Sequence, residues 1–143
     1  LKATAAANDN KNAHLAYVSA LQALERFEEA EARLKVLLEH EPHDTVWQQR
    51  MEKVQFEVRK RRRPDYYSIL GVSRVASAME VKAAYKQRAM QWHPDKHDSA
   101  EVKQRAEEMF KLLGEALLVL EDTMRRQLYD AGYDKEAIEE RMQ

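Results

Sequence analysis

The chain has 143 residues, of which 44% are hydrophobic and 34% charged, with only three glycines and three prolines. This composition is typical of a folded, helix-rich protein and excludes a disordered one. The 24 basic and 25 acidic residues nearly cancel, which gives no global reason to expect nucleic acid or a membrane as a partner. The absence of cysteine excludes disulfides and thiolate metal sites and fits a reducing compartment. The first residue is leucine rather than methionine, so we expect a piece of a longer protein.

Three helices are predicted before Pro64. Residues 12–24 and 28–40 each carry one apolar face and form a helical hairpin; the two faces consist of Leu15, Val18, Leu21, Leu24, Ala30, Leu34, Leu37 and Leu38. A third helix opens after Asp44, a good N-cap residue. It carries Trp47, Met51, Val54 and Val58 on one face and runs to about residue 63.

A domain boundary is predicted at Pro64, because the residue before a proline is biased away from helix. Four helical segments follow, at residues 65–70, 78–92, about 101–121 and 123–129. Gly71 is a plausible end for the first, and Ser77 with Glu80 forms a capping box for the second. The two long helices should pack antiparallel, with a tight polar loop between them.

That loop holds the segment QWHPDKHD, residues 91–98. His93 and His97 are four residues apart, as metal ligands on a helix are, but Pro94 breaks the helix that this spacing requires. His93 and Asp95 could form an acid–base pair, although no nucleophile pattern or phosphate-binding loop accompanies them. A helix stop followed by a solvated turn is the third interpretation, and composition alone favours it. We therefore expect neither an enzyme nor a bound metal or cofactor.

Three stretches of the second half together resemble a J-domain, the module of DnaJ-type co-chaperones. They are DYYSILGV, KAAYKQRAMQWHPDK and FKLLGEALLVLEDTMRRQLYD, and the resemblance covers residues 65–130. It implies a four-helix fold that binds a heat shock protein 70 chaperone and stimulates its ATP hydrolysis. The binding residues that it implies are His93, Pro94, Asp95, Lys82, Lys86, Met90, Lys96, Phe110 and Lys111. The core residues that it implies are Tyr66, Leu70, Val81, Tyr85, Ala89 and Leu113.

Several positions depart from the J-domain pattern. Met79, Ala83, Gln87 and Gln91 stand where many relatives carry basic residues, so the positive face of residues 78–92 is thin. Arg88 occupies a position that is often leucine. In MRRQLYD, Arg125 and Arg126 match the basic motif of the family's fourth helix, and Met124 and Gln127 do not. Weak or selective binding of the partner is expected from these departures.

The first half resembles a tetratricopeptide repeat, on Leu21, Phe27, Ala30, Leu34 and Leu37 counted back from Pro42. Residues 1–10 are then the tail of a preceding repeat. Asn12 and Ala16 stand where that family places a basic clamp for acidic chaperone tails, so tail binding is expected only in repeats upstream. A generic helical hairpin that serves as a spacer or scaffold is the alternative.

Together the halves predict an all-α protein: the end of a tetratricopeptide solenoid (1–43), a linking or capping helix (44–63), a J-domain (64–132) and a C-terminal tail (133–143). The combination resembles the cytosolic co-chaperones that join such repeats to a J-domain. Its expected partners are heat shock protein 70, unfolded client proteins and, through upstream repeats, heat shock protein 90. A structural subunit of a larger assembly is the alternative function. The basic run at residues 59–63 is interpreted as the end of a spacer helix, with a nuclear signal or nucleic-acid patch as the alternative. We expect a cytoplasmic location, and the nuclear-signal alternative would add a nuclear one.

Overall fold

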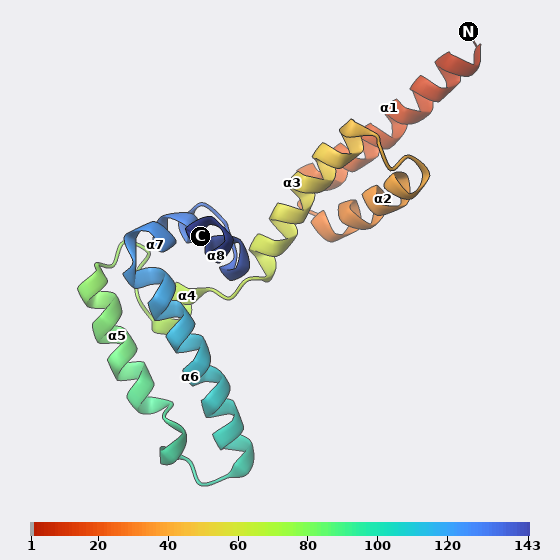
Figure 1. Cartoon of the computed structure of the whole chain (residues 1–143). Helices are drawn as coiled ribbons and strands as arrows, with labels where there is room; N and C mark the ends of the chain where they lie inside the picture. Colours follow the sequence, from red (N-terminus) through yellow and green to blue (C-terminus); the bar gives the residue numbers. More distant parts are fainter. Residues whose placement is uncertain (1) are drawn as a thin grey trace. The chain divides into compact units, whose positions relative to one another are not determined.

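The computed structural model describes residues 2–143, with side chains from Asn10 onward. The described residues are helical or loop and contain no strand. The all-α prediction is therefore confirmed. The chain divides into two compact units, with the boundary after Arg62, and Figure 1 shows the order of the helices within each. Each unit is described by itself.

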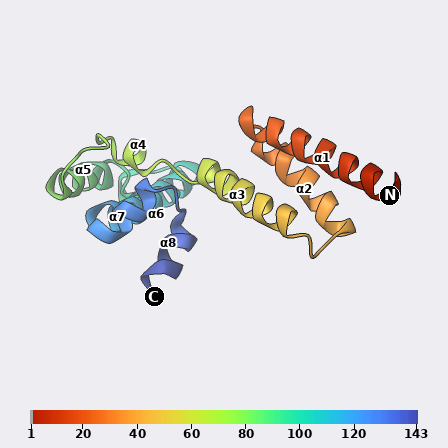
Figure 2. The same cartoon turned by 90° about the horizontal axis from the view of Figure 1, so that it is seen from above.

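The first unit consists of α1 (Lys2–Ala23), α2 (Phe27–His40) and α3 (Thr45–Arg62). Helices α1 and α2 form the predicted hairpin and lie side by side in Figure 2. Seven buried residues from all three helices form one core: Val18, Leu21, Ala30, Leu34, Trp47, Val54 and Val58. Helix α3 thus completes the core of this unit and is more than a connecting segment.

Asp44 begins α3 as expected. Its carboxylate accepts the backbone N–H groups of Val46 and Trp47, at 2.9 and 3.2 Å. The Lys11 ammonium donates to the other carboxylate oxygen, and this hydrogen bond is the main reason that the pKa of Asp44 lies below its usual value. The start of α3 is thereby tied to α1.

Helix α1 differs from the prediction at both ends. Residues 2–10, expected as the tail of a preceding repeat, continue the same helix, and Leu1 lies outside the described residues. The alanine-rich sequence KATAAAN favours helix without needing an apolar face. At the other end Leu24 follows the helix and is 65% exposed, so it does not extend the apolar face. The turn to α2 contains Glu25 at φ 60°, in the left-handed region.

The basic run at the end of α3 makes contacts within its own unit. Arg61 forms ion pairs with Glu57 and, at 3.5 Å, with Glu25. Arg62 lies 3.1 Å from the carboxylate of Glu28. These pairs with α2 and with the turn before it favour the interpretation of the run as a helix end.

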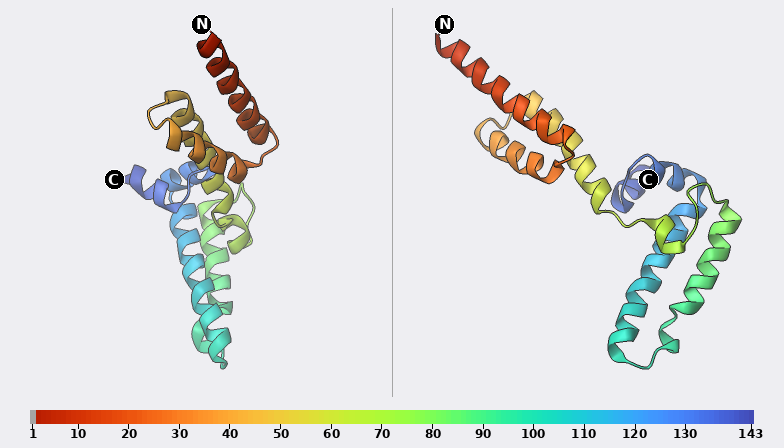
Figure 3. Two further views of the ribbon diagram at one scale, coloured as in Figure 1. Left: turned by 90° about the vertical axis from the view of Figure 1, so that its right-hand side faces the viewer. Right: turned by 180° about the vertical axis from the view of Figure 1, so that it is seen from behind.

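The second unit contains α4 (Tyr66–Leu70), α5 (Ala78–Gln91), the 3-10 helix η1 (Pro94–Lys96), α6 (Ala100–Glu121), α7 (Thr123–Asp130) and α8 (Lys135–Met142). Helices α5 and α6 form the expected antiparallel hairpin, with α4 and α7 near one end and the connecting loop at the other (Figures 1 and 3). Tyr66, Leu70, Val81 and Leu113 are buried in the core, as the resemblance implied. Tyr85 and Ala89 are half-buried, and Tyr85 packs against that core.

Caps and one arginine fix the end of the hairpin that lies near α4. Gly71 ends α4 at φ 71°, and the Ser77 hydroxyl accepts the N–H of Glu80 at 3.1 Å to begin α5. Between them, the Arg126 guanidinium donates to the carbonyls of Ala76 (2.6 Å) and Arg74 (2.9 Å). Helix α7 therefore holds the loop that sets the start of α5.

The structure corrects one boundary. Residues 133–143, expected as a tail, form α8, and its Ile138 is fully buried in the core of the second unit. The Asp134 carboxylate accepts the N–H of Ala137 at 3.0 Å and caps the helix. Arg125 pairs with Glu139 at 3.0 Å. The sequence DKEAIEERM shows little apolar periodicity, and one apolar residue with a cap does not predict a helix that packs on the core.

Candidate functional site

The segment QWHPDKHD forms a short structured turn at the end of the α5–α6 hairpin. Trp92 caps the C-terminus of α5, and η1 follows with Pro94 at its first position. His93 is the N-cap of η1: its Nδ1 accepts the backbone N–H of Asp95 at 3.2 Å. Because Nδ1 accepts, the ring proton of a neutral His93 lies on Nε2. The segment is therefore more ordered than a plain solvated turn.

Helix α6 supports this turn from the side. The His93 ring meets the Phe110 ring edge-on, with ring centroids 5.7 Å apart and planes at 78°. Edge-to-face pairs at this distance are favourable. Two residues 17 positions apart, His93 and Phe110, thus meet at the hairpin end, as expected for a shared surface.

Asp95 points its carboxylate into solvent. Its side chain is 91% exposed, and its Oδ2 lies 3.7 Å from Nδ1 of His93, which is too far for a hydrogen bond. The backbone of Asp95 is fixed by Pro94 before it and by the hydrogen bond from its N–H to His93. An exposed carboxylate on a fixed backbone can meet an arginine or lysine of a partner with little loss of entropy.

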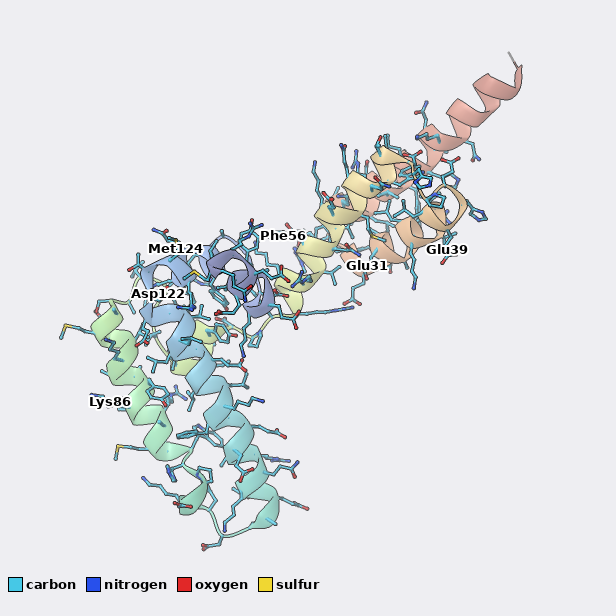
Figure 4. All side chains as sticks on the ribbon, viewed as in Figure 1. Glu31, Glu39, Phe56, Lys86, Asp122 and Met124 are labelled. Carbon is cyan, nitrogen blue, oxygen red and sulfur yellow. The ribbon has the colours of Figure 1, made fainter. Side chains whose placement is uncertain are left out.

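The remaining predicted residues lie on the same hairpin. Lys82, Lys86 and Met90 are exposed and follow one another at four-residue steps along α5, so they share one face of that helix. Figure 4 shows Lys86 directed away from α6. Lys96 is exposed on η1 and Lys111 on α6, next to Phe110. Eight of the nine predicted residues therefore belong to α5, η1 and α6, and His93 lies between α5 and η1 as the N-cap of η1. Seven of the nine are exposed, whereas Pro94 and Phe110 are half-buried, and Phe110 supports the turn.

The thin positive face predicted for α5 has a structural counterpart. Met79, Ala83, Gln87 and Gln91 are all exposed, and Met79 is 81% exposed. Lys82 and Lys86 thus stand among neutral side chains. The half-buried Arg88 lies on the inner side, where its guanidinium packs over the glycine that ends α4; a Cβ added at Gly71 would come within 2.5 Å of it.

The metal interpretation of His93 and His97 has no geometric support in the described residues. Within that part of the chain no group of three or more histidine, aspartate or glutamate side chains is arranged to hold a metal ion. The two rings face different aromatic partners, Phe110 for His93 and Trp92 for His97.

Among the described helices none has both the length and the apolar character needed to cross a membrane.

The sequence does not predict that Trp92 and His97 support the turn. The rings of Trp92 and His97 lie 6.4 Å apart, centroid to centroid, and Trp92 also packs against the core of the unit. Nε2 of His97 is buried and has no hydrogen-bond partner among the described residues. Neither contact follows a helical period, so the only available signal was an aromatic residue placed directly before His93.

Comparison with known proteins gives two domain matches. Residues 65–130 match the DnaJ domain, and residues 2–53 match a tetratricopeptide repeat. The second match extends through the first part of α3, in agreement with the shared core of α1, α2 and α3.

The relatives that this chain matches are longer proteins. Human DnaJ homolog subfamily C member 7 is 46% identical over 88 residues, which is 60% of this chain and 18% of that protein. Its homolog in Schizosaccharomyces pombe is 38% identical over 115 residues, 80% of this chain and 24% of the relative. Bovine DnaJ homolog subfamily C member 3 is 36% identical over 126 residues, 88% of this chain and 25% of the relative. The chain therefore spans a quarter or less of the length of these relatives. With the helical repeat and the J-domain hairpin both in place, the chain belongs to the J-domain co-chaperone family, in the class of DnaJ proteins that carry tetratricopeptide repeats.

Proposed function

We propose that the second unit binds a heat shock protein 70 chaperone and stimulates its ATP hydrolysis. The observation that carries this proposal is the turn at His93, Pro94 and Asp95, which is formed in the free chain and presents the Asp95 carboxylate to solvent. A structural copy of the domain has no need for an exposed carboxylate on a fixed backbone. The chain itself carries out no catalysis in this proposal, since ATP is bound and hydrolysed by the partner.

The residues around the turn have different roles in binding the partner. Asp95 pairs with a cationic side chain of the partner and fixes the register of the complex. Lys82 and Lys86, exposed along α5, attract an acidic groove and raise the rate of encounter. Met90 is 63% exposed and adds apolar contact area beside these charges. Lys96 and Lys111 flank the turn, and Phe110 supports it.

The first unit supplies the coupling to other proteins. We propose that the tetratricopeptide part brings an unfolded client, or heat shock protein 90 through further repeats, near the partner of the J-domain. The cytoplasm is the compartment that fits this role and the absence of cysteine. An additional nuclear location is a further part of the proposal. The ion pairs that Arg61 and Arg62 form argue against recognition of these two side chains as a nuclear localisation signal.

A second candidate is a structural subunit that uses the same fold as a scaffold. The neutral residues on the outer face of α5, with Met79 81% exposed, favour it. The two candidates differ in one respect, which is whether the Asp95 carboxylate is needed.

The test is single-turnover ATP hydrolysis by a cytosolic heat shock protein 70, with and without the chain. Asp95→Asn and His93→Gln are compared with Asp98→Asn, a neutral substitution of another exposed carboxylate in the same loop. The proposal expects stimulation by the wild-type chain and by Asp98→Asn. It expects a loss of about tenfold or more for Asp95→Asn, because a buried partner cation is left unpaired.

Circular dichroism of each variant shows whether it is folded. A folded wild-type chain without stimulation, or equal stimulation by Asp95→Asn and the wild type, would favour the scaffold candidate instead.

A further inference from the structure

His97 links the functional turn to the core of the second unit. Its backbone N–H donates to the carbonyl of Pro94 at 3.2 Å and closes η1. Its ring lies against Trp92, with centroids 6.4 Å apart and planes at 40°. Trp92 in turn bonds to α5, through its N–H to the carbonyl of Arg88 at 3.0 Å, and packs against the core. The position of the turn therefore depends on where the His97 ring rests.

The ring rests there with one polar atom unused. Nε2 of His97 is buried, and no described atom is placed to hydrogen-bond with it. In a neutral ring protonated on Nδ1, Nε2 is an unused acceptor. An imidazolium carries an N–H on both nitrogens, so the Nε2–H would be buried without an acceptor. The neutral ring fits this place, and the charged ring fits better in water.

Other charges near the loop do not offset this difference. On the loop the charged or titratable groups are His93, Asp95, Lys96 and Asp98; on the part of α6 that follows the loop they are Glu101, Lys103, Arg105, Glu107, Glu108 and Lys111; at the end of α5 it is Arg88. All except Arg88, which packs over Gly71, are exposed to solvent. Water and salt screen exposed charges, so the contact with Trp92 and the buried Nε2 decide which form of the ring is accepted.

We propose that His97 is a positioning residue for the turn of His93, Pro94 and Asp95. Its neutral ring, resting on Trp92, holds the turn in the form that a partner reads, and protonation of the ring releases the turn. The order of the turn is present at neutral pH and is lost as the pH falls, so binding of the chaperone weakens in the same direction. This inference rests on the proposed function.

Two substitutions separate the ring from its nitrogen. His97→Phe keeps an aromatic ring on Trp92 and removes the titration, whereas His97→Ala removes the ring. The control is His43→Phe, an exposed histidine of the first unit. The concentration of chain that gives half-maximal stimulation of the chaperone is measured above and below the range in which histidine titrates, at about pH 7.5 and about pH 6.0.

At the higher pH, His97→Ala raises this concentration about threefold to tenfold, because the turn must be ordered during binding, while His97→Phe stays within about twofold of the wild type. On acidification the wild type and His43→Phe weaken by about twofold or more beyond the change seen in His97→Phe. This comparison also removes the contributions that all variants share, including that of the chaperone itself.

Equal activity of His97→Ala and the wild type at the higher pH would overturn the proposal, as would equal weakening of the wild type and His97→Phe. Amide NMR of Asp95 reads the turn without a partner: its signal should change with pH more in the wild type than in His97→Phe. If this difference appears and no variant stimulates ATP hydrolysis, the proposed function fails and the positioning role stands. If stimulation appears without the difference, the positioning role fails.

Discussion

Arg126 shows how one half-buried side chain can fix a segment far away in the sequence. It donates to two backbone carbonyls in the loop before α5 and, at 3.2 Å, to the hydroxyl of Tyr67. The resemblance to a basic motif of the family's fourth helix singled this residue out without a mechanism. The contacts give it a structural role, because they join α7 to α4 and to the loop before α5 within one unit.

We expect Arg126→Ala to lower the free energy of unfolding by about 1.5 to 3 kcal/mol, since it removes hydrogen bonds from a charged donor and leaves their acceptors partly unsatisfied. Urea denaturation followed by circular dichroism measures this change. Gln127→Ala, at the exposed neighbouring position, is the control and should change stability little. A result for Arg126→Ala no larger than for the control would contradict the role.

Tyr66 gives the second unit a dependence on alkaline pH. The side chain is 1% exposed, and burial, followed by the nearby Glu115 carboxylate, raises its pKa to about 12. The folded state therefore prefers the neutral phenol, while an unfolded tyrosine ionises near pH 10. Its contribution to stability is fully present below about pH 10 and is lost as the pH rises toward about 12.

Urea denaturation at a series of pH values from about 8 to about 11.5 tests this expectation. The free energy of unfolding should fall at the alkaline end, and it should fall less in Tyr66→Phe. Some decline remains in that variant, because burial also raises the pKa of Tyr67 and of Tyr129. The same slope in both proteins would show that Tyr66 ionises freely in the folded state.

At the scale of single helices, α8 contributes to the stability of the second unit although its sequence does not suggest it. It lies beyond the matched DnaJ domain, yet Ile138 is fully buried with the residues of that domain. Ion pairs of Arg125 with Glu139 and of Lys135 with Glu115 tie it to α7 and α6. We infer that the stable unit of this chain ends after α8.

Ile138→Ala should lower the free energy of unfolding of the second unit by about 2 to 5 kcal/mol, because it opens a cavity in the core. Glu140→Ala on the exposed side of α8 is the matched control. Chemical denaturation followed by tyrosine fluorescence or NMR measures both. Two variants of equal stability would mean that α8 is only loosely attached.

The elements that the sequence could predict are those with a strong period or a recognisable cap. Asp44, Gly71 and Ser77 mark three helix ends correctly, and the apolar face of residues 101–121 matches α6. Helix α8 could not be predicted in this way, because a single buried isoleucine gives no repeating apolar pattern. In the site, the resemblance selected the hairpin residues, whereas the hydrogen bond from Asp95 to His93 and the place of His97 depend on η1 and on tertiary packing. A proline in a loop predicts a break and not the turn that follows it.

At the scale of the whole molecule, the described core residues form two separate hydrophobic cores, one in each unit. The seven residues of the first core and those of the second form separate clusters with no residue in common. Leu34→Ala should therefore destabilise the first unit by about 2.7 to 5 kcal/mol, with no change in the protection of α5 and α6. Hydrogen exchange read by mass spectrometry separates the two units in one experiment.

Faster exchange in both units after this substitution would show that their stabilities are coupled. Val36→Ala, at a position that is 46% exposed on α2, is the control for an apolar truncation outside the core. It should leave exchange in both units close to that of the wild type.

The exposed outer face of α5 also makes this domain a convenient starting point for engineering. Met79, Ala83, Gln87 and Gln91 lie in solvent, and surface substitutions at such positions usually change stability by no more than about 0.5 kcal/mol. The pattern of charge on this helix can thus be rewritten without rebuilding the core behind it. Combinatorial libraries at these four positions, screened against variants of the proposed chaperone partner, would select domains with a changed preference for that partner.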